Sequence, residues 1–238
     1  NVTVTPTSDT AATVAIPSAI YGLSVSTVVG IKVKNSDNRT SATINKSVIN
    51  QPSGGTISNS GGYRIHTFTS SGTFVNTIAN LSVEYLVIAG GGGSGRQHGG
   101  GGGAGGYRNS TGSENSGRNS TTESKLTLST GNKTVTVGAG GAASSGAGVK
   151  GANDANSVFD SITSLGGGGG GSYYSSSNSA ANGASGGSGG GAGSIETSGG
   201  SGASGGAGTS GQGFDGGDST YAGGGAGGAG GAGQDGSG

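Results

Sequence analysis

The fold is decided where Val83-Glu84-Tyr85-Leu86-Val87-Ile88-Ala89 runs directly into Gly90-Gly91-Gly92-Gly93. The segment before the glycines is apolar on both faces and rich in β-branched side chains, which predicts a central strand of a sheet. The glycines open a different regime, because only seven of the 61 glycines precede residue 90. We therefore expect a β-rich first part and a glycine-rich second part.

An ordinary hydrophobic core cannot fill this chain, because apolar residues make up 28% and charged residues 9% of its 238 residues. Glycine loses more backbone entropy on folding than any other residue, so an ordered glycine tract must be held by backbone hydrogen bonds. The chain has no Cys, which excludes disulfides and thiolate chemistry. It has no run of about 20 apolar residues, so we expect no membrane span. A chain that begins at Asn1 without any Met is expected to be matured or a fragment.

The predicted fold class is all-β, in three parts. Residues 1–52 read as a short antiparallel β-sheet or sandwich module, with a hairpin across residues 29–48 that turns at 35–38. The order Gly22-Leu23, Thr27, Val29, Ile31, Val33 and Asn35 resembles the second half of a fibronectin type III-like sandwich domain. Residues 53–62 are expected to be a flexible Gly/Ser linker, and residues 63–238 a glycine-rich domain.

Further strands are expected inside the glycine-rich domain. They are predicted at residues 63–74, 126–128, 135–137 and 158–162. These strands, with Phe214 and Tyr221, supply most of its apolar side chains.

Ordered landmarks between the glycines resemble a known family. The landmarks are Ile65 to Phe74, Val83 to Gly92, Gly105-Gly106-Tyr107-Arg108, Val135 to Gly141, Ser157-Val158-Phe159, Gly211-Gln212-Gly213 and Asp215-Gly216-Gly217. Together they resemble the glycine-rich domain of phage tail-fibre and adhesin-type virion proteins, over residues 63–238. The resemblance implies a distal, extracellular position and surface recognition, without a reaction. Residues 109–130 depart from the pattern, being polar and free of long glycine runs.

The glycine tracts have two possible structures, an ordered bundle of polyglycine II helices or disordered linkers. Ala226, Ala229 and Ala232 recur at a spacing of three, which places their methyl groups on one edge of a threefold helix. A bundle of such helices would satisfy N–H and C=O groups between neighbours. The ordered bundle is the favoured interpretation.

Four aromatic residues are candidates for receptor contact. Tyr173, Tyr174, Phe214 and Tyr221 would lie on turns at an exposed tip of such a bundle, where rings with a polar handle suit carbohydrate or protein recognition. The alternative, equally weighted, is that these rings cap the bundle by packing on glycine backbone.

No catalytic, cofactor or metal site is predicted. The G-x-G-x-x-G matches follow from glycine content alone, and none opens a helix after a strand. His66 and His98 are the only histidines; His66 is expected to be structural and His98 an exposed loop residue. Asp215, Asp218 and Asp235 lack the nine-residue period of glycine-aspartate calcium repeats. No basic block interleaved with aromatic residues favours nucleic-acid binding.

Charge and glycosylation motifs are unevenly distributed. All eleven Lys and Arg residues lie between Lys32 and Lys150, and residues 151–238 carry only acids. Possible N-glycosylation motifs occur at Asn1, Asn38, Asn45, Asn80, Asn109, Asn119 and Asn132. They matter only if the source glycosylates its secreted proteins.

Two functions are compatible with these observations, and neither is enzymatic. The first is a phage tail-fibre or spike component that contacts a host receptor, either a carbohydrate or an outer-membrane protein. The alternative is a polymerising subunit of a microbial extracellular filament with strand exchange between copies. The expected partners are copies of the chain or other fibre proteins, on a virion surface or in a cell-surface filament.

Overall fold

The computed structural model describes residues 28–31, 44–47, 51–146, 148–173, 178–195 and 202–237. The chain divides into two compact units, Asn1–Gln51 and Pro52–Gly238. Strands and extended segments make up nearly all of the described structure, as predicted for an all-β chain, and the one helix among these residues is α2 (Asn178–Ala181). None of the helical structure described is long and apolar enough to cross a membrane.

The first unit contains an antiparallel pair of strands, β1 (Val28–Ile31) and β2 (Ile44–Ser47). The register joins Val28 to Ser47 and Ile31 to Ile44, which confirms the hairpin predicted across residues 29–48. The predicted turn at 35–38 and the other landmarks of a sandwich half lie outside the described residues.

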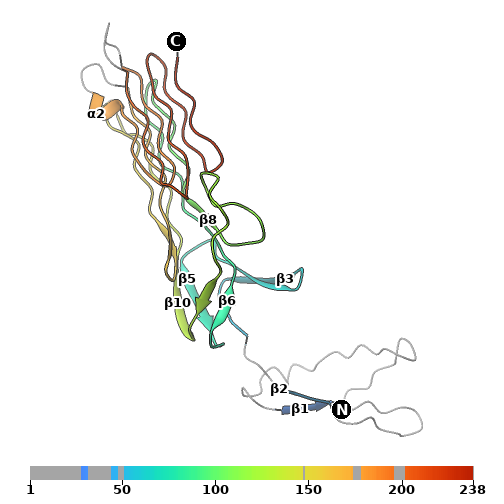
Figure 1. Ribbon diagram of the computed structural model, residues 1–238. Coiled ribbons are helices and arrows are strands. Elements are labelled where there is room, and N and C mark those ends of the chain that lie inside the picture. Colours follow the sequence, from blue (N-terminus) through green and yellow to red (C-terminus); the bar gives the residue numbers. More distant parts are fainter. Residues whose placement is uncertain are drawn as a thin grey trace, which may run out of the picture. The chain divides into compact units, whose positions relative to one another are not determined.

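The second unit begins with a hairpin of β3 (Thr56–Ser60) and β4 (Tyr63–Thr67) (Figure 1). The flexible linker predicted at 53–62 is therefore wrong. Gly61 and Gly62, at φ 58° and 83°, form the tight turn of this hairpin instead of a loose connection. No residue of the two strands is fully buried: Ile57 and Ile65 are 38% and 41% exposed, and His66 is half-buried.

Small sheets complete what we call the β base. The strands are β5 (Gly72–Asn76), β6 (Leu81–Val83), β7 (Leu86–Ile88), β8 (Tyr107–Asn109), β9 (Leu126–Leu128), β10 (Gly131–Thr136), β11 (Ser157–Phe159) and β12 (Ile162–Ser164). They pair as a four-stranded sheet, in the order β12-β11-β10-β5, and as the pairs β6-β9 and β7-β8. Two small clusters of buried side chains lie between them, one around Phe74, Leu128 and Val135 and the other around Tyr85, Val87 and Ile162.

The segment 83–89 is not the single central strand that its composition predicts. It breaks between β6 and β7, because the Tyr85 N–H bonds to the Ser110 hydroxyl (2.8 Å) and leaves the ladder. One face of β7 is buried through Val87, whereas Leu86 and Ile88 are 50% and 51% exposed. The strand predicted at 158–162 is likewise two strands, β11 and β12, which meet at a turn where Asp160 has φ 52°.

Beyond the β base, the glycine tracts form an ordered bundle of extended segments that run side by side (Figure 1). We call this the glycine bundle. Its segments span residues 90–96, 99–106, 138–145, 150–156, 165–173, 180–186, 187–195, 202–208, 213–219, 222–228 and 232–237.

The hydrogen bonds of the bundle repeat every third residue. The N–H groups of Gly100, Gly103 and Gly106 donate to the carbonyls of Gly171, Gly168 and Leu165, at 2.8, 2.8 and 2.7 Å. The N–H groups of Gly101 and Ala104 donate to a different segment, at Gly224 and Gly227. A threefold, extended segment that bonds only to its neighbours is the polyglycine form of the polyproline II helix.

Segment 187–195 lies at the centre of this lattice. It donates backbone hydrogen bonds to segments 99–106, 180–186 and 213–219, partly through His98 at the adjoining turn. It accepts hydrogen bonds from segments 165–173, 202–208 and 222–228. Residues 187–195 are all buried, so this segment replaces the hydrophobic core of an ordinary domain with satisfied backbone groups.

Hydrogen-bonded neighbours arrange the segments in three layers. The first layer has the order 138–145, 90–96, 99–106, 222–228 and 232–237; the second has 150–156, 165–173, 187–195 and 213–219; the third has 180–186 and 202–208. Close contact between neighbouring segments requires glycine, both within a layer and between layers. A Cβ added at Gly190 would overlap the carbonyl oxygen of Gly169, and one added at Gly191 would overlap that of Gly224.

The predicted threefold edge of alanines is interrupted. The Gly228 N–H donates to the Gly231 carbonyl (2.9 Å), so the chain turns back at this point and Ala226 and Ala232 lie on different segments. The return allows the Gly225 N–H to reach the Gln234 carbonyl at 2.7 Å. An antiparallel neighbour thus stabilises the end of the chain where one long helix would have left its backbone unpaired.

Side chains of Asn and Asp complete the lattice at its edges. The Asn153 and Asn156 side-chain oxygens accept from the N–H groups of Gly169 (2.8 Å) and Gly166 (3.0 Å). The Asp218 carboxylate accepts from the Gly205 N–H at 2.9 Å. Each of these oxygens takes the place that a neighbouring carbonyl occupies inside the bundle.

Candidate functional site: the tip of the glycine bundle

The segments of the glycine bundle turn at two ends, and the end away from the β strands is here called the tip. Its described turns lie at residues 96–99, 144–146 with 148–150, and 219–222, with α2 nearby (Figure 1). Each turn joins segments that are fixed by the lattice below it. Loops on a rigid scaffold are where binding residues concentrate, so the tip is the candidate site.

The turn at 96–98 carries three long polar side chains. The Gly95 N–H donates to the Gly100 carbonyl (2.9 Å), which closes the turn. Gln97 and His98 occupy the left-handed region, with φ 49° and 46°, and both side chains are exposed. The Arg96 N–H is held by the Ser172 hydroxyl (2.9 Å), and its guanidinium donates to the Ser145 carbonyl (3.2 Å).

Two of the predicted aromatic residues lie at this tip. The Tyr173 N–H donates to the Arg96 carbonyl (3.1 Å), and its ring meets that of His98 edge to face, with centroids 6.2 Å apart. Tyr221 is 67% exposed, and its carbonyl accepts from the Ser194 hydroxyl at 2.8 Å. Tyr174 lies outside the described residues.

Phe214 lies at the opposite end of the bundle, near the β base, so the four aromatic residues do not share one tip. Its N–H donates to the Gly228 carbonyl and its carbonyl accepts from Gly189, both at 2.9 Å. The Arg118 guanidinium carbon lies 5.6 Å from the centre of the ring. Arg118 also binds the Asp215 carboxylate with two hydrogen bonds, at 2.8 and 2.9 Å. These contacts fit the capping interpretation of Phe214.

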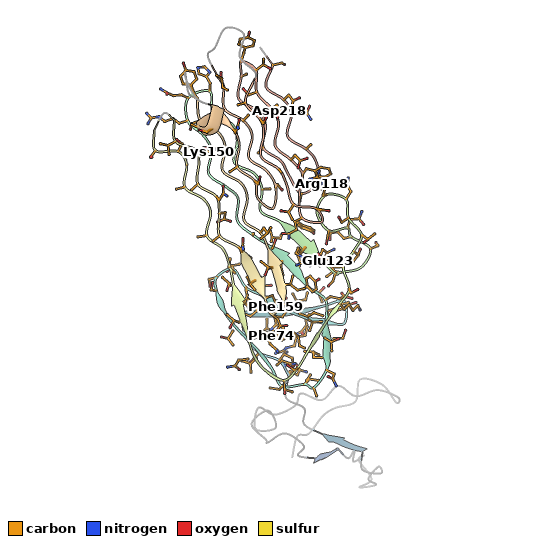
Figure 2. The ribbon with its side chains drawn as sticks, turned by 60° about the vertical axis from the view of Figure 1, so that its left-hand side comes forward. Phe74, Arg118, Glu123, Lys150, Phe159 and Asp218 are labelled. Carbon is orange, nitrogen blue, oxygen red and sulfur yellow. The ribbon has the colours of Figure 1, made fainter. Side chains whose placement is uncertain are left out.

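Charges are separated at the tip. Figure 2 labels Lys150 and Asp218 near this end, and they belong to segments 150–156 and 213–219, the two outer segments of the second layer. Arg96 and His98 lie on Lys150's side of the tip, because the Ser144 N–H bonds to Ser94 and the Gly148 N–H to Tyr173. The uneven charge along the sequence therefore becomes a basic corner and an acidic corner.

The acidic corner has a structural use for its carboxylates. Besides Asp218, Asp235 accepts from the Asp218 N–H at 2.9 Å. At the opposite end of the same segment, near the β base, Asp215 accepts from the Gly208 N–H at 2.8 Å. The hydrogen bond from Arg118, followed by that from Gly208, lowers the pKa of Asp215. Among the described residues, no three His, Asp or Glu side chains converge as metal ligands would.

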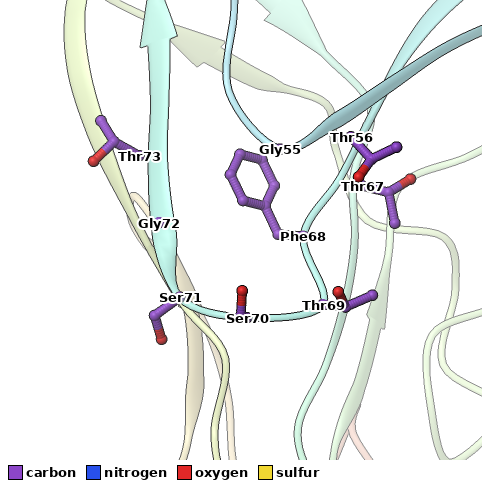
Figure 3. A pocket seen from close by; sticks show the side chains of 9 residues that line it. All are labelled: Gly55, Thr56, Thr67, Phe68, Thr69, Ser70, Ser71, Gly72 and Thr73. Carbon is purple, nitrogen blue, oxygen red and sulfur yellow. The ribbon is translucent and has the colours of Figure 1, made fainter.

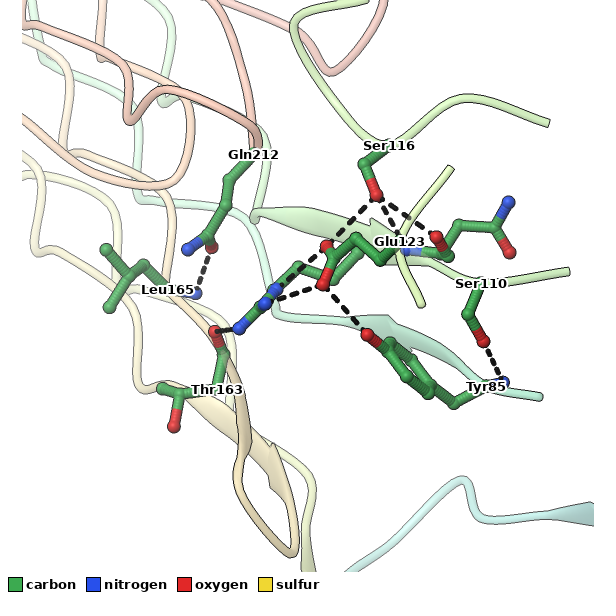
Figure 4. Close-up of polar contacts among 9 residues, drawn as sticks. Tyr85, Ser110, Ser116, Glu123, Thr163, Leu165 and Gln212 are labelled. Atoms are coloured by element: carbon green, nitrogen blue, oxygen red, sulfur yellow. Dashed lines mark hydrogen bonds and ion pairs between the residues drawn. The ribbon is translucent and has the colours of Figure 1, made fainter. Parts of the chain in front are cut away.

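A polar network links strands of the β base to the loop between β8 and β9 (Figure 4). Arg108 donates to both oxygens of Glu123, at 2.9 and 2.6 Å, and to the Thr163 carbonyl at 3.2 Å. The Tyr85 hydroxyl donates to the same carboxylate at 2.8 Å. Burial, then the hydrogen bond to Glu123, raises the pKa of Tyr85 to about 12. Burial opposes ionisation of Glu123, but the hydrogen bonds from Arg108, Tyr85 and Ser116 lower its pKa overall.

Hollows lie among the described residues of this unit, and two of them bear on binding. One, of ≈ 370 Å³, is lined by Arg108, Ser116, Ser120, Thr121, Glu123, Ser210, Gly211 and Gln212. The other, of ≈ 250 Å³, lies beside Phe68 and is lined by small polar residues and glycine (Figure 3). The cation of the first is neutralised by Glu123, and no charged side chain lines the second.

His66 lies in the β base, away from the tip. Its Nδ1 bonds to the Gly54 carbonyl at 2.8 Å, so Nδ1 carries the proton, and its ring packs edge to face on Phe74 at 4.9 Å. These contacts give His66 a packing role, as expected.

The glycosylation motifs differ in accessibility. Asn80, Asn119 and Asn132 are exposed, the first two at left-handed φ values in turns. Asn109 is 0% exposed, and its side-chain amide donates to the Glu114 carbonyl at 2.8 Å, so a glycan there is incompatible with this fold. Asn1 and Asn38, and the side chain of Asn45, lie outside the described residues.

The sequence predicts an exposed loop position for His98 but no role for its neighbours Arg96 and Gln97. The available signal was Arg96-Gln97-His98 inside an otherwise glycine-rich run. The run itself does not indicate that these three residues lie at the tip, because this depends on the hydrogen-bond partners of the segments on either side.

Comparison with known proteins identifies the domain. The glycine-rich domain family matches residues 69–238, more than half of the chain. The chain therefore belongs to the glycine-rich domain family. No curated protein matches it, and no solved structure does.

Proposed function

We propose that this member of the glycine-rich domain family is a non-enzymatic, adhesive component of an extracellular fibre, in which the tip of the glycine bundle contacts a host surface receptor. The observation that carries the proposal is the lattice itself. The backbone N–H and C=O groups of the bundle are occupied by hydrogen bonds between segments. The same hydrogen bonds hold exposed turns such as 96–98 and 219–222 in fixed positions at one end. Rigid presentation lowers the entropy that a binding loop loses on contact.

The sequence resemblance to tail-fibre domains supports a phage tail-fibre or spike component as the parent particle. Such a fibre displays many copies, and many weak contacts sum through multivalency. The expected receptor is a carbohydrate or an outer-membrane protein on the host surface.

A second candidate, a polymerising subunit of a microbial extracellular filament, is favoured by the β3–β4 hairpin. Its sheet has two strands, and Ile57, Tyr63 and Ile65 are 38%, 58% and 41% exposed. A two-stranded hairpin is marginally stable by itself in water, and its open edges can accept a strand from another copy.

Immunogold electron microscopy of the native source distinguishes the two. Antibodies against the glycine bundle should label short fibres on particles if the first candidate is correct. Label along micron-long uniform filaments would support the second. Label confined to unassembled material would contradict both.

A further inference from the structure

The turn at 96–98 has non-glycine residues at positions whose backbone conformation favours glycine. Gln97 and His98 both have left-handed φ values, a conformation that glycine adopts without strain. The chain places glycine on both sides of this turn, at Gly95 and Gly99. Non-glycine residues in such a conformation point to a use for their side chains.

The side chains beside this turn are basic and aromatic. The Arg96 guanidinium donates one hydrogen bond to the Ser145 carbonyl, and the ring of Tyr173 lies against that of His98. Lys150 begins the neighbouring segment, in the turn whose Gly148 N–H bonds to the Tyr173 carbonyl (3.3 Å). We call Arg96, Gln97, His98, Lys150 and Tyr173 the basic corner.

The cations of the basic corner have no anionic partner within the described part of the chain. The ion pairs found there join Arg108 to Glu123, Arg118 to Asp215, Lys125 to Glu84 and Lys133 to Asp160. The nearest acid on Lys150's own segment is Asp154, which lies beside Gly90 at the other end of the neighbouring segment. Asp218 and Asp235 are engaged with backbone N–H groups at the acidic corner.

We propose that the basic corner binds an anionic saccharide. Arg96 and Lys150 pair with its carboxylate, sulfate or phosphate groups, since a guanidinium offers a planar fork to such anions. The Tyr173 and His98 rings offer apolar faces with polar edges to the sugar ring, and the Gln97 amide can both donate to and accept from hydroxyls. This inference rests on the proposed adhesive function and names the receptor chemistry.

The composition of the corner favours a saccharide over a nucleic acid or a protein. Two permanent cations are too few to follow a nucleic-acid backbone. A protein contact of ordinary size needs a larger apolar centre, and the exposed large apolar side chains of the described residues are mostly in the β base, with Val149 and Tyr221 at the tip.

Binding of the intact protein to immobilised polymers tests the proposal. Polygalacturonate presents carboxylates, dextran sulfate presents sulfates, and neutral dextran is the uncharged control. We expect binding to one or both anionic polymers, and at least tenfold weaker binding to dextran. The two anionic arms distinguish the chemical source of the charge. Affinity should fall as salt is raised from 50 to 300 mM.

Matched variants distinguish binding at the basic corner from binding through positive charge elsewhere on the protein. Arg96→Gln with Lys150→Gln should weaken binding at least tenfold, whereas Arg64→Gln, an exposed arginine in β4, should leave it unchanged. Gln97→Gly with His98→Gly removes two side chains while relieving the left-handed backbone. This variant should bind several-fold more weakly with an unchanged or higher Tm, so misfolding cannot account for the loss.

Equal binding of dextran, or anionic binding that survives Arg96→Gln with Lys150→Gln, would overturn the inference. An equal loss in Arg64→Gln would overturn it as well, because binding would then follow net charge alone. The proposed function is tested separately by immunogold labelling of particle fibres. A fibre that is labelled but shows no anion-dependent binding keeps the adhesive function and rejects the anionic saccharide.

Discussion

The β base and the glycine bundle belong to one compact unit but are ordered by different forces. In the β base, side chains such as Phe74, Leu128 and Val135 exclude water from between small sheets. In the bundle, segment 187–195 is buried with few side chains and is held by backbone bonds to six neighbours. Burial of backbone groups that are all hydrogen-bonded can therefore replace burial of apolar side chains, provided that the segments approach closely enough. Because its segments are in close contact, the bundle should be destabilised by one added methyl group. The base depends on packed apolar side chains, so it should be destabilised when methyl groups are removed.

Adding a methyl group at the centre of the bundle should have the largest effect. Gly190→Ala would drive a Cβ into the Gly169 carbonyl, where a backbone rather than a flexible side chain would have to move. We expect a loss of more than about 4 kcal/mol in the free energy of unfolding, beyond ordinary overpacking. Thermal unfolding and amide hydrogen exchange of residues 165–195 measure it.

The matched control is Gly230→Ala. Gly230 has no atom within 4 Å of an added Cβ and has no left-handed φ. Alanine there should be neutral or stabilise by up to about 1 kcal/mol, because it restricts the unfolded chain. If both variants unfold alike, the close lattice is wrong.

Removing methyl groups from the β base should have the next largest effect. Leu128 is 0% exposed, so Leu128→Ala should cost about 3 kcal/mol through lost burial and a cavity. Hydrogen exchange should accelerate in β5 and β10, while residues 187–195 keep their protection because their bonds do not involve this cluster. Loss of protection in both regions together would show that the base and the bundle unfold as one.

The sequence predicts both β strands and ordered glycine segments, but not how the strands and the glycine segments alternate along the chain. Alternating apolar residues identified most strands, and the long glycine tracts indicated threefold helices. The alanines at 226, 229 and 232 do not share one helix, because the chain turns between residues 228 and 231. Segment 83–89 was assigned one strand because periodicity cannot reveal that Ser110, distant in sequence, captures the Tyr85 N–H. Residues 53–62 looked like a linker because Gly61-Gly62 serves equally well as a tight turn.

The candidate site was less predictable than the fold. Aromatic residues on turns could be named, but which end of the bundle each turn occupies depends on hydrogen-bond partners far along the chain. Phe214 and Tyr221 are seven residues apart in the sequence, about the length of one segment, and so fall at opposite ends. Segment length, read together with the direction of each segment, would be needed to place such residues.

The Tyr85–Glu123 bond tests the polar network of the β base. Tyr85→Phe keeps the ring and removes the hydroxyl that donates to Glu123, so we expect a loss of about 2 kcal/mol at neutral pH. Since the folded pKa of Tyr85 is raised to about 12, its contribution is complete below pH 10 and is lost as the pH rises from about 10 to 12. Tm measured across pH 8–12 should fall less steeply for Tyr85→Phe than for the wild type.

Tyr221→Phe is the control for this pH profile, because Tyr221 is exposed at the tip. It should leave the profile unchanged. Identical profiles for wild type and Tyr85→Phe would show that the hydroxyl does not ionise with the stated linkage.

The edge of the bundle should respond least, because water can partly replace a lost partner there. Asn153 is exposed, and its side-chain oxygen accepts from the buried Gly169 N–H at 2.8 Å. The Asn153 side-chain amide also donates to the Ser185 carbonyl at 3.3 Å, so Asn153→Ala removes one close and one longer hydrogen bond and should cost about 1 kcal/mol. Asn153→Asp keeps the acceptor for the Gly169 N–H but loses the donor to Ser185, so it should retain part of the stability. Hydrogen exchange at Gly169 should accelerate in Asn153→Ala and stay slow in Asn153→Asp. If Asn153→Ala leaves the Gly169 N–H fully protected from exchange, the edge of the bundle is ordered without this side-chain acceptor. Side-chain oxygens at the edges would then not contribute to the stability of the bundle.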